Sequence, residues 1–169
     1  NHGTSNERML AYYMLGCVYR DLYEAPMALE NYDKAAEQAD TTKKDCDYTT
    51  LSRIYGQMGI LFEKQHIPYQ ELSALNNATK YAYLAKDTLN AILFFQNKST
   101  AFYDLSEIDS AIHINLKAYN LLKKHGYIIL FAWGILEGEA RLIMAGLLSH
   151  SGHMNLYIAI FVAGLGGFV

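Results

Sequence analysis

The 169-residue sequence predicts an all-α protein built from antiparallel helical hairpins. Between residues 12 and 35, aromatic and aliphatic residues recur three and four positions apart, which places them on one face of each helix. The same pattern returns 43 residues later and again after a further 40. Both prolines, Pro26 and Pro68, fall where the second helix of a hairpin would begin. Proline is tolerated there because the first N–H groups of a helix have no partner within it.

Six helices are expected, and each boundary has a local cause. The polar segment 40–45 separates the first hairpin from the second, and the polar segment 104–109 precedes the last helix. Asp109 is expected to be the N-cap of that helix because its carboxylate can accept hydrogen bonds from free N–H groups. The expected helices are 7–22, 26–40, 47–65, 68–85, 88–104 and 109–124.

The first copy of the pattern is the clearest. It comprises Tyr12, Leu15, Gly16 and Tyr19 on the first helix, and Ala28, Tyr32 and Ala35 on the second. Gly16 and Ala28 are small where the two helices must approach each other closely. The order and spacing resemble the signature of the tetratricopeptide repeat (TPR) family, with tyrosine where that family often has tryptophan.

Two weaker copies follow. The second has Tyr55, Met58, Gly59, Phe62, Glu71, Leu75 and Ala78, and the third has Phe95, Ser99, Phe102, Ala111 and Ala118. Glu71 stands where Ala28 stands in the first copy, and Lys98 and Asn115 break the pattern of the third. The copies are longer than the usual period of about 34 residues, which predicts lengthened helices or loops.

The resemblance covers residues 7–125 and implies hairpins stacked as a short right-handed solenoid in a domain of residues 1–126. Such a solenoid is a scaffold without catalytic chemistry that binds a peptide or partner protein on its concave face. On the family's pattern the groove is lined by the outward positions of each first helix: Leu10, Tyr13, Cys17, Arg20, Arg53, Gly56, Ile60, Glu63, Leu93, Gln96, Thr100 and Tyr103. The members that bind chaperone tails carry Lys and Asn where this chain has Tyr13 and Cys17, so their carboxylate clamp is absent. The repeat sequences also resemble those of TPR chains in bacterial sensors and lipoproteins of the Bacteroidetes type. In those proteins the repeat array is often attached to a membrane anchor and lies outside it.

Other functions are disfavoured by composition and by missing motifs. A net charge of −3 without a long basic run argues against a nucleic-acid partner. The sequence has no P-loop, dinucleotide-binding motif, nucleophile elbow or zinc-binding HExxH, and it predicts no enzyme, cofactor or metal. His150 and His153 lack further ligands and are expected to lie in a polar turn. Cys17 and Cys46 are expected to be free thiols.

Residues 127–169 differ in composition from the preceding part of the chain. They contain three of the 31 charged residues and seven of the 12 glycines. This composition predicts an apolar, membrane-associated helical hairpin that turns near 149–153. The segments 133–139, 145–148 and 163–169 resemble the N-terminal part of DedA-family membrane proteins, which implies Glu137 or Glu139 as the acidic residue of a transport or lipid-translocation site. A C-terminal membrane anchor, a fusion of unrelated pieces and a buried final hairpin remain alternatives. The start of the chain, without methionine, predicts a fragment or a removed leader.

Overall fold

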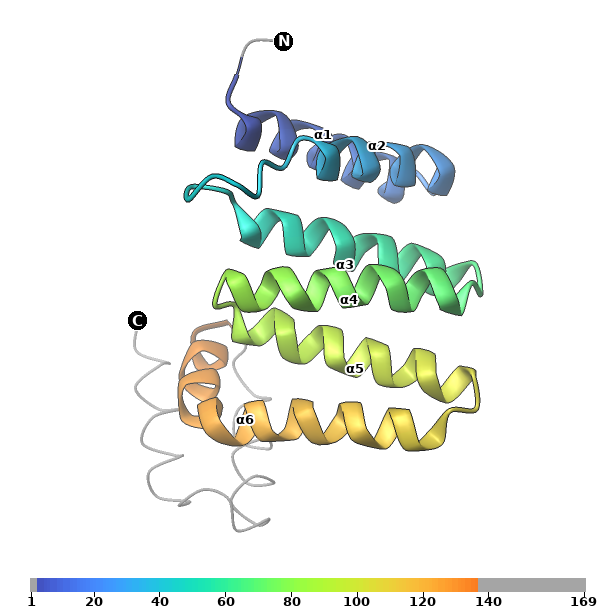
Figure 1. Cartoon of the computed structure of the whole chain (residues 1–169), viewed down its shortest axis with the longest axis vertical. Coiled ribbons are helices and arrows are strands. Elements are labelled where there is room, and N and C mark those ends of the chain that lie inside the picture. Colours follow the sequence, from blue (N-terminus) through green and yellow to red (C-terminus); the bar gives the residue numbers. More distant parts are fainter. Residues whose placement is uncertain (1–2, 137–169) are drawn as a thin grey trace. The chain divides into compact units, whose positions relative to one another are not determined.

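The computed structural model describes residues 3–136, and this part of the chain is entirely α-helical apart from its turns and linkers (Figure 1). Its six helices pack as sequential antiparallel pairs, as the repeat pattern predicts. They are α1 (Ser5–Asp21), α2 (Ala25–Glu37), α3 (Tyr48–Lys64), α4 (Pro68–Leu84), α5 (Thr88–Asp104) and α6 (Ile108–Leu136). The internal contacts divide the chain into two compact units, Asn1–Ala118 and Tyr119–Val169, and the packing described below lies within the first unit.

The first helix of each pair begins with a side-chain cap. Thr4 Oγ1 accepts a hydrogen bond from the Glu7 N–H at 3.2 Å, and the Glu7 carboxylate accepts one from the Thr4 N–H at 2.6 Å. Asp47 and Asp87 cap α3 and α5 in the same position, accepting hydrogen bonds from backbone N–H groups at 3.0 and 3.1 Å. The second helices α2 and α4 begin instead with Pro26 and Pro68 in their first turns, as predicted.

Four helix connections share one turn geometry. Each contains one residue in the left-handed region, with φ of 57–62°, at Tyr23, His66, Lys86 and Ser106. The N–H of the following residue donates to the carbonyl oxygen five positions back, at 2.9–3.0 Å, which is the Schellman arrangement that satisfies the last carbonyl groups of a helix. The linker between α2 and α3 is longer and has no such residue. The repeated turn therefore joins α4 to α5 as tightly as it joins the helices of a pair.

Two predicted boundaries are wrong. α6 begins at Ile108, so Asp109 lies in its first turn rather than at its N-cap. The same helix continues to Leu136 instead of ending at 124, so residue 126 lies within it, and the predicted division into domains at 126 stays a prediction. Residues 125–136 contain no proline, and a single internal glycine costs only about 1 kcal/mol relative to alanine, so Gly126 does not end the helix. All other predicted helix ends lie within about three residues of the observed ones.

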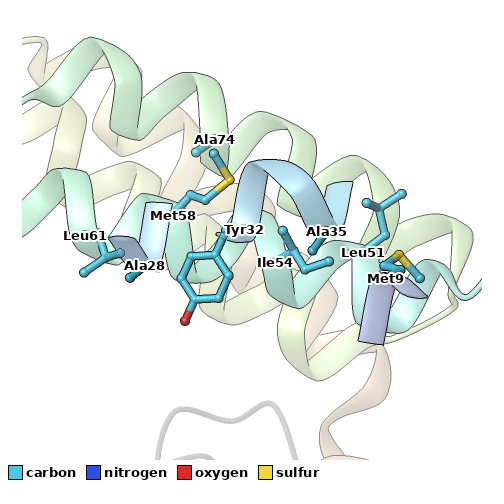
Figure 2. Packing of buried hydrophobic residues seen from close by; sticks show 9 residues of the cluster. All are labelled: Met9, Ala28, Tyr32, Ala35, Leu51, Ile54, Met58, Leu61 and Ala74. Carbon is cyan, nitrogen blue, oxygen red and sulfur yellow. The ribbon is translucent and has the colours of Figure 1, made fainter. Parts of the chain in front are cut away.

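The buried core joins the first hairpin to the second. Figure 2 shows its members on α1 to α4: Met9, Ala28, Tyr32, Ala35, Leu51, Ile54, Met58, Leu61 and Ala74. Among the residues whose burial the structure describes, Tyr32 is the largest fully buried side chain. Its ring covers Gly16 so closely that a Cβ atom there would lie 2.4 Å from the ring. Leu75 covers Gly59 in the second hairpin in the same way. The predicted close approach at Gly16 is thus confirmed, and it recurs.

A third glycine connects the second and third hairpins. Phe94 of α5 is buried against Gly56 of α3, where an added Cβ would lie 2.4 Å from the ring. Gly56 was expected to line the groove, and that prediction is wrong because the aromatic ring of the next hairpin covers it.

Replacing Gly56 with valine should therefore push Phe94 out of its site and lower the free energy of unfolding by about 1–3 kcal/mol, measured by urea denaturation. Ser73→Val, at an exposed position of α4, is the control and should change stability little. Adding Phe94→Leu to the Gly56→Val variant should recover part of the loss, since it removes the clashing ring. If the two substitutions instead add independently, Gly56 and Phe94 are not coupled as described.

Candidate functional site

The predicted groove comprises the block of outward residues on α1, α3 and α5. Within it, Tyr13, Cys17, Arg20 and Ile60 are half-buried, whereas Leu10, Arg53, Glu63, Gln96 and Tyr103 are exposed. Leu93 and Thr100 are also exposed. The exposed members do not form the core, so their side chains are accessible for contacts outside the chain.

The structure brings the α1 and α3 residues of the predicted groove together. The Tyr13 ring lies 6.0 Å from the Tyr32 ring, and the Tyr32 hydroxyl approaches Cys17 Sγ at 3.6 Å. Burial raises the pKa of Tyr13, and the neighbouring Cys17 raises it further, while Arg53 and Arg20 act in the opposite direction. Both guanidinium groups therefore lie near one half-buried aromatic side chain.

The two arginines of this region differ in their partners. Arg20 donates from Nη1 to Gln57 Oε1 at 2.6 Å, and its Nη2 pairs with Asp21 at 2.7 Å, so it connects α1 to α3. Arg53 is exposed and forms no hydrogen bond or ion pair with any residue that the structure describes. Arg53 is consequently the cation of the predicted groove that is available to bind a carboxylate.

Three carboxylates, those of Glu71, Glu63 and Asp104, lie near one another on the second and third hairpins. Glu71 of α4 is 3% exposed, and its carboxylate forms no hydrogen bond or ion pair within residues 3–136. Burial raises its pKa to about 7, and the neighbouring carboxylates of Glu63 and Asp104 contribute in the same direction. No group of His, Cys, Asp or Glu side chains in the described region could hold a metal ion. Glu71 and Asp104 were not predicted as site residues, and the only sequence signal was a carboxylate at the position of Ala28.

The two pattern breaks of the third hairpin have different consequences. Lys98 is 8% exposed, and its ammonium donates to Asn76 Oδ1 of α4 at 2.6 Å. Burial lowers the pKa of Lys98, and Lys117 lowers it further. The Lys98 side chain therefore connects α5 to α4. At the equivalent position of the second hairpin, Met58 of α3 is buried.

Asn115, by contrast, is exposed and lines an open surface pocket of about 310 Å³ between α5 and α6. The pocket wall comprises Ser99, Thr100, Tyr103, Ile108, Ala111, Ile112 and Asn115. Thr100 and Tyr103 belong to the predicted groove, so the pocket shares two α5 residues with it. The sequence identified Asn115 as irregular but did not predict the pocket.

Several sequence predictions concern other residues. Glu137, Glu139, His150 and His153, with the predicted hairpin beyond 136, lie outside the described residues. Among the helices of residues 3–136, none combines the length and apolar character needed to cross a membrane. Cys17 and Cys46 are both free thiols, as predicted.

No protein-family description, curated protein sequence or solved structure matches this chain, and its function is inferred from the residues of the predicted groove.

Proposed function

We propose that the chain is a non-catalytic TPR-like scaffold that binds a peptide or partner protein along the predicted groove. The helices of residues 1–126 would stack as a right-handed solenoid, with the groove on its concave face. The Schellman turns at Tyr23, His66 and Ser106, the aspartate caps of α3 and α5 and the close side-chain contacts over Gly16 and Gly59 support this arrangement, because each recurs at equivalent repeat positions.

One observation carries the proposal most directly. Arg53 lies beside Tyr13 on the first-helix surface, is exposed, and has no ionic partner in the described part of the chain. Exposed Glu63 has the opposite charge further along the same block of residues. A partner segment that carries one acidic and one basic side chain fits this surface. Charge complementarity of this kind fixes the register of a bound peptide and excludes wrong partners.

Selection of peptides from a random display library on the full chain tests the proposal. The selected peptides should contain an acidic residue, and Arg53→Glu should weaken their binding about tenfold or more, because it replaces an attractive contact with a repulsive one. Lys44→Glu is the matched control, since it reverses a charge at an exposed position of the α2–α3 linker. Failure to enrich any peptide, or an equal loss in both variants, would contradict the proposal.

A further inference from the structure

Three carboxylates of the second and third hairpins have no cationic partner among residues 3–136. α3 ends, α4 begins and α5 ends on the same side of these hairpins (Figure 1). Glu63 lies in the last turn of α3, Glu71 lies in the first turn of α4, and Asp104 is the last residue of α5. Every ion pair of the described residues lies between positions 20 and 43. The acidic cluster, which comprises Glu63, Glu71 and Asp104, is therefore not neutralised within the described chain.

Glu71 is the unusual member of the acidic cluster. Its position is taken by Ala28 in the first hairpin and by Ala111 in the third, and both alanines are buried. Glu71 is only 3% exposed, and no side-chain nitrogen or oxygen of the described residues is both sealed from solvent and without a hydrogen bond. Because the Glu71 carboxylate has no hydrogen bond there, its oxygens must reach the surface. A ligand that donates hydrogen bonds to this largely buried carboxylate would offset the cost of its burial.

The helix ends add to the negative field at the acidic cluster. The last carbonyl groups of a helix carry a partial negative charge, so a carboxylate in the last turn is unfavourable. Glu63 and Asp104 both occupy such positions and are exposed. In the first hairpin, Arg20 stands where Glu63 stands and pairs with Asp21, the equivalent of Asp104. The second and third hairpins thus lack a cation that the first hairpin supplies from its own sequence.

The cation that fits the acidic cluster is an arginine side chain. Among the described residues no group of carboxylates could hold a metal ion, so the cluster needs a cation that spans separate side chains. A guanidinium does so, because its donors point in several directions in one plane and it is more weakly hydrated than an ammonium. Glu63 is also a residue of the predicted groove, so a peptide bound there can extend an arginine to the cluster.

We propose that Glu63, Glu71 and Asp104 together bind one arginine side chain of the partner. The inference rests on the proposed function, because the partner bound in the predicted groove supplies the arginine. Arg53 then binds the acidic residue of the partner and the acidic cluster binds its basic residue, which fixes the direction in which the partner lies.

N-Acetylarginine amide is the probe, and N-acetylcitrulline amide, which is uncharged and of the same shape, is its control. Both are added at low salt and at pH 8, above the Glu71 pKa of about 7, so that the carboxylate is ionised. In the full chain labelled with carbon-13 at its carboxyl groups, the arginine probe should shift the NMR signals of the acidic cluster, with a dissociation constant on the order of 10 mM. The citrulline analogue should not shift them.

Glu71→Ala separates binding from folding. The substitution restores the residue of the other two hairpins, so it should raise the melting temperature at pH 8 and abolish the shifts of Glu63 and Asp104. Glu71→Gln keeps the size of the side chain and should also abolish these shifts. Glu24→Ala, which removes an exposed carboxylate from the first hairpin, is the matched control and should leave the response unchanged.

Equal responses to the two probes, unshifted carboxyl signals, or a response that persists in Glu71→Ala would overturn the arginine site. Peptides selected on the full chain should contain an arginine. Its replacement by citrulline should weaken binding about tenfold to the wild-type chain, but little to Glu71→Ala. A library that yields no peptide contradicts the proposed function, whereas the probe experiment measures the acidic cluster directly and does not depend on that result.

Discussion

Replacement of Tyr32 with alanine is expected to lower the free energy of unfolding by about 3–5 kcal/mol, which would leave much of the chain unfolded. The ring is 0% exposed, covers Gly16 and lies 6.0 Å from the Tyr13 ring, so its removal leaves a cavity that these neighbours cannot fill. Urea denaturation followed by circular dichroism measures the loss.

Two further variants separate the causes of this loss. Tyr32→Phe should cost only about 1 kcal/mol, since it removes the weak hydroxyl contact to Cys17 and keeps the ring. Tyr69→Ala, at a tyrosine that is 72% exposed, should change stability by less than about 0.5 kcal/mol. A Tyr32→Ala chain as stable as Tyr69→Ala would show that the first hairpin does not pack as described.

The second large effect is a pH dependence caused by Glu71. Its pKa is raised to about 7 from the ordinary value of 4.5, so the native state holds a proton that the unfolded chain releases between these values. Stability from this group is therefore fully present below pH 4.5 and is lost as the pH rises through about 7. The expected loss is about 3 kcal/mol over this interval.

Denaturant unfolding at a series of pH values tests this dependence. Glu71→Gln should remove most of the decrease between pH 4.5 and 7, because the amide cannot ionise. Glu24→Gln, at an exposed position before α2, should keep the wild-type profile. If wild type and Glu71→Gln have parallel profiles, the Glu71 carboxylate is not buried beside Glu63 and Asp104.

The sequence predicted helices well where their ends are marked by local chemistry. Pro26, Pro68 and the polar linker after α2 place helix boundaries with little help from tertiary contacts. The end of α6 could not be predicted, because no residue near 124 breaks a helix. Asp109 failed as a predicted cap because the preceding Ser106 turn already starts α6 at Ile108.

The candidate site was predicted in part, for a physical reason. The repeat spacing places Tyr13, Arg20 and Arg53 on one surface, since equivalent residues of successive hairpins have equivalent orientations. Gly56 was misassigned because Phe94, which covers it, belongs to a different hairpin. The sequence around Gly56 therefore contains no sign of this contact. The burial of Glu71 and the pocket beside Asn115 likewise depend on neighbours distant in the sequence.

The most direct test of a partner-binding groove is site-specific photo-crosslinking in cells of the source organism. Benzoylphenylalanine placed at Gln96, an exposed groove position on α5, should crosslink the full chain to one discrete protein, and Arg53→Glu should abolish the product. The same group at Ser73, an exposed position on α4 outside the groove, should give no such product. A crosslink that forms equally from Ser73, or that survives Arg53→Glu, would contradict the assignment of this surface as the binding groove.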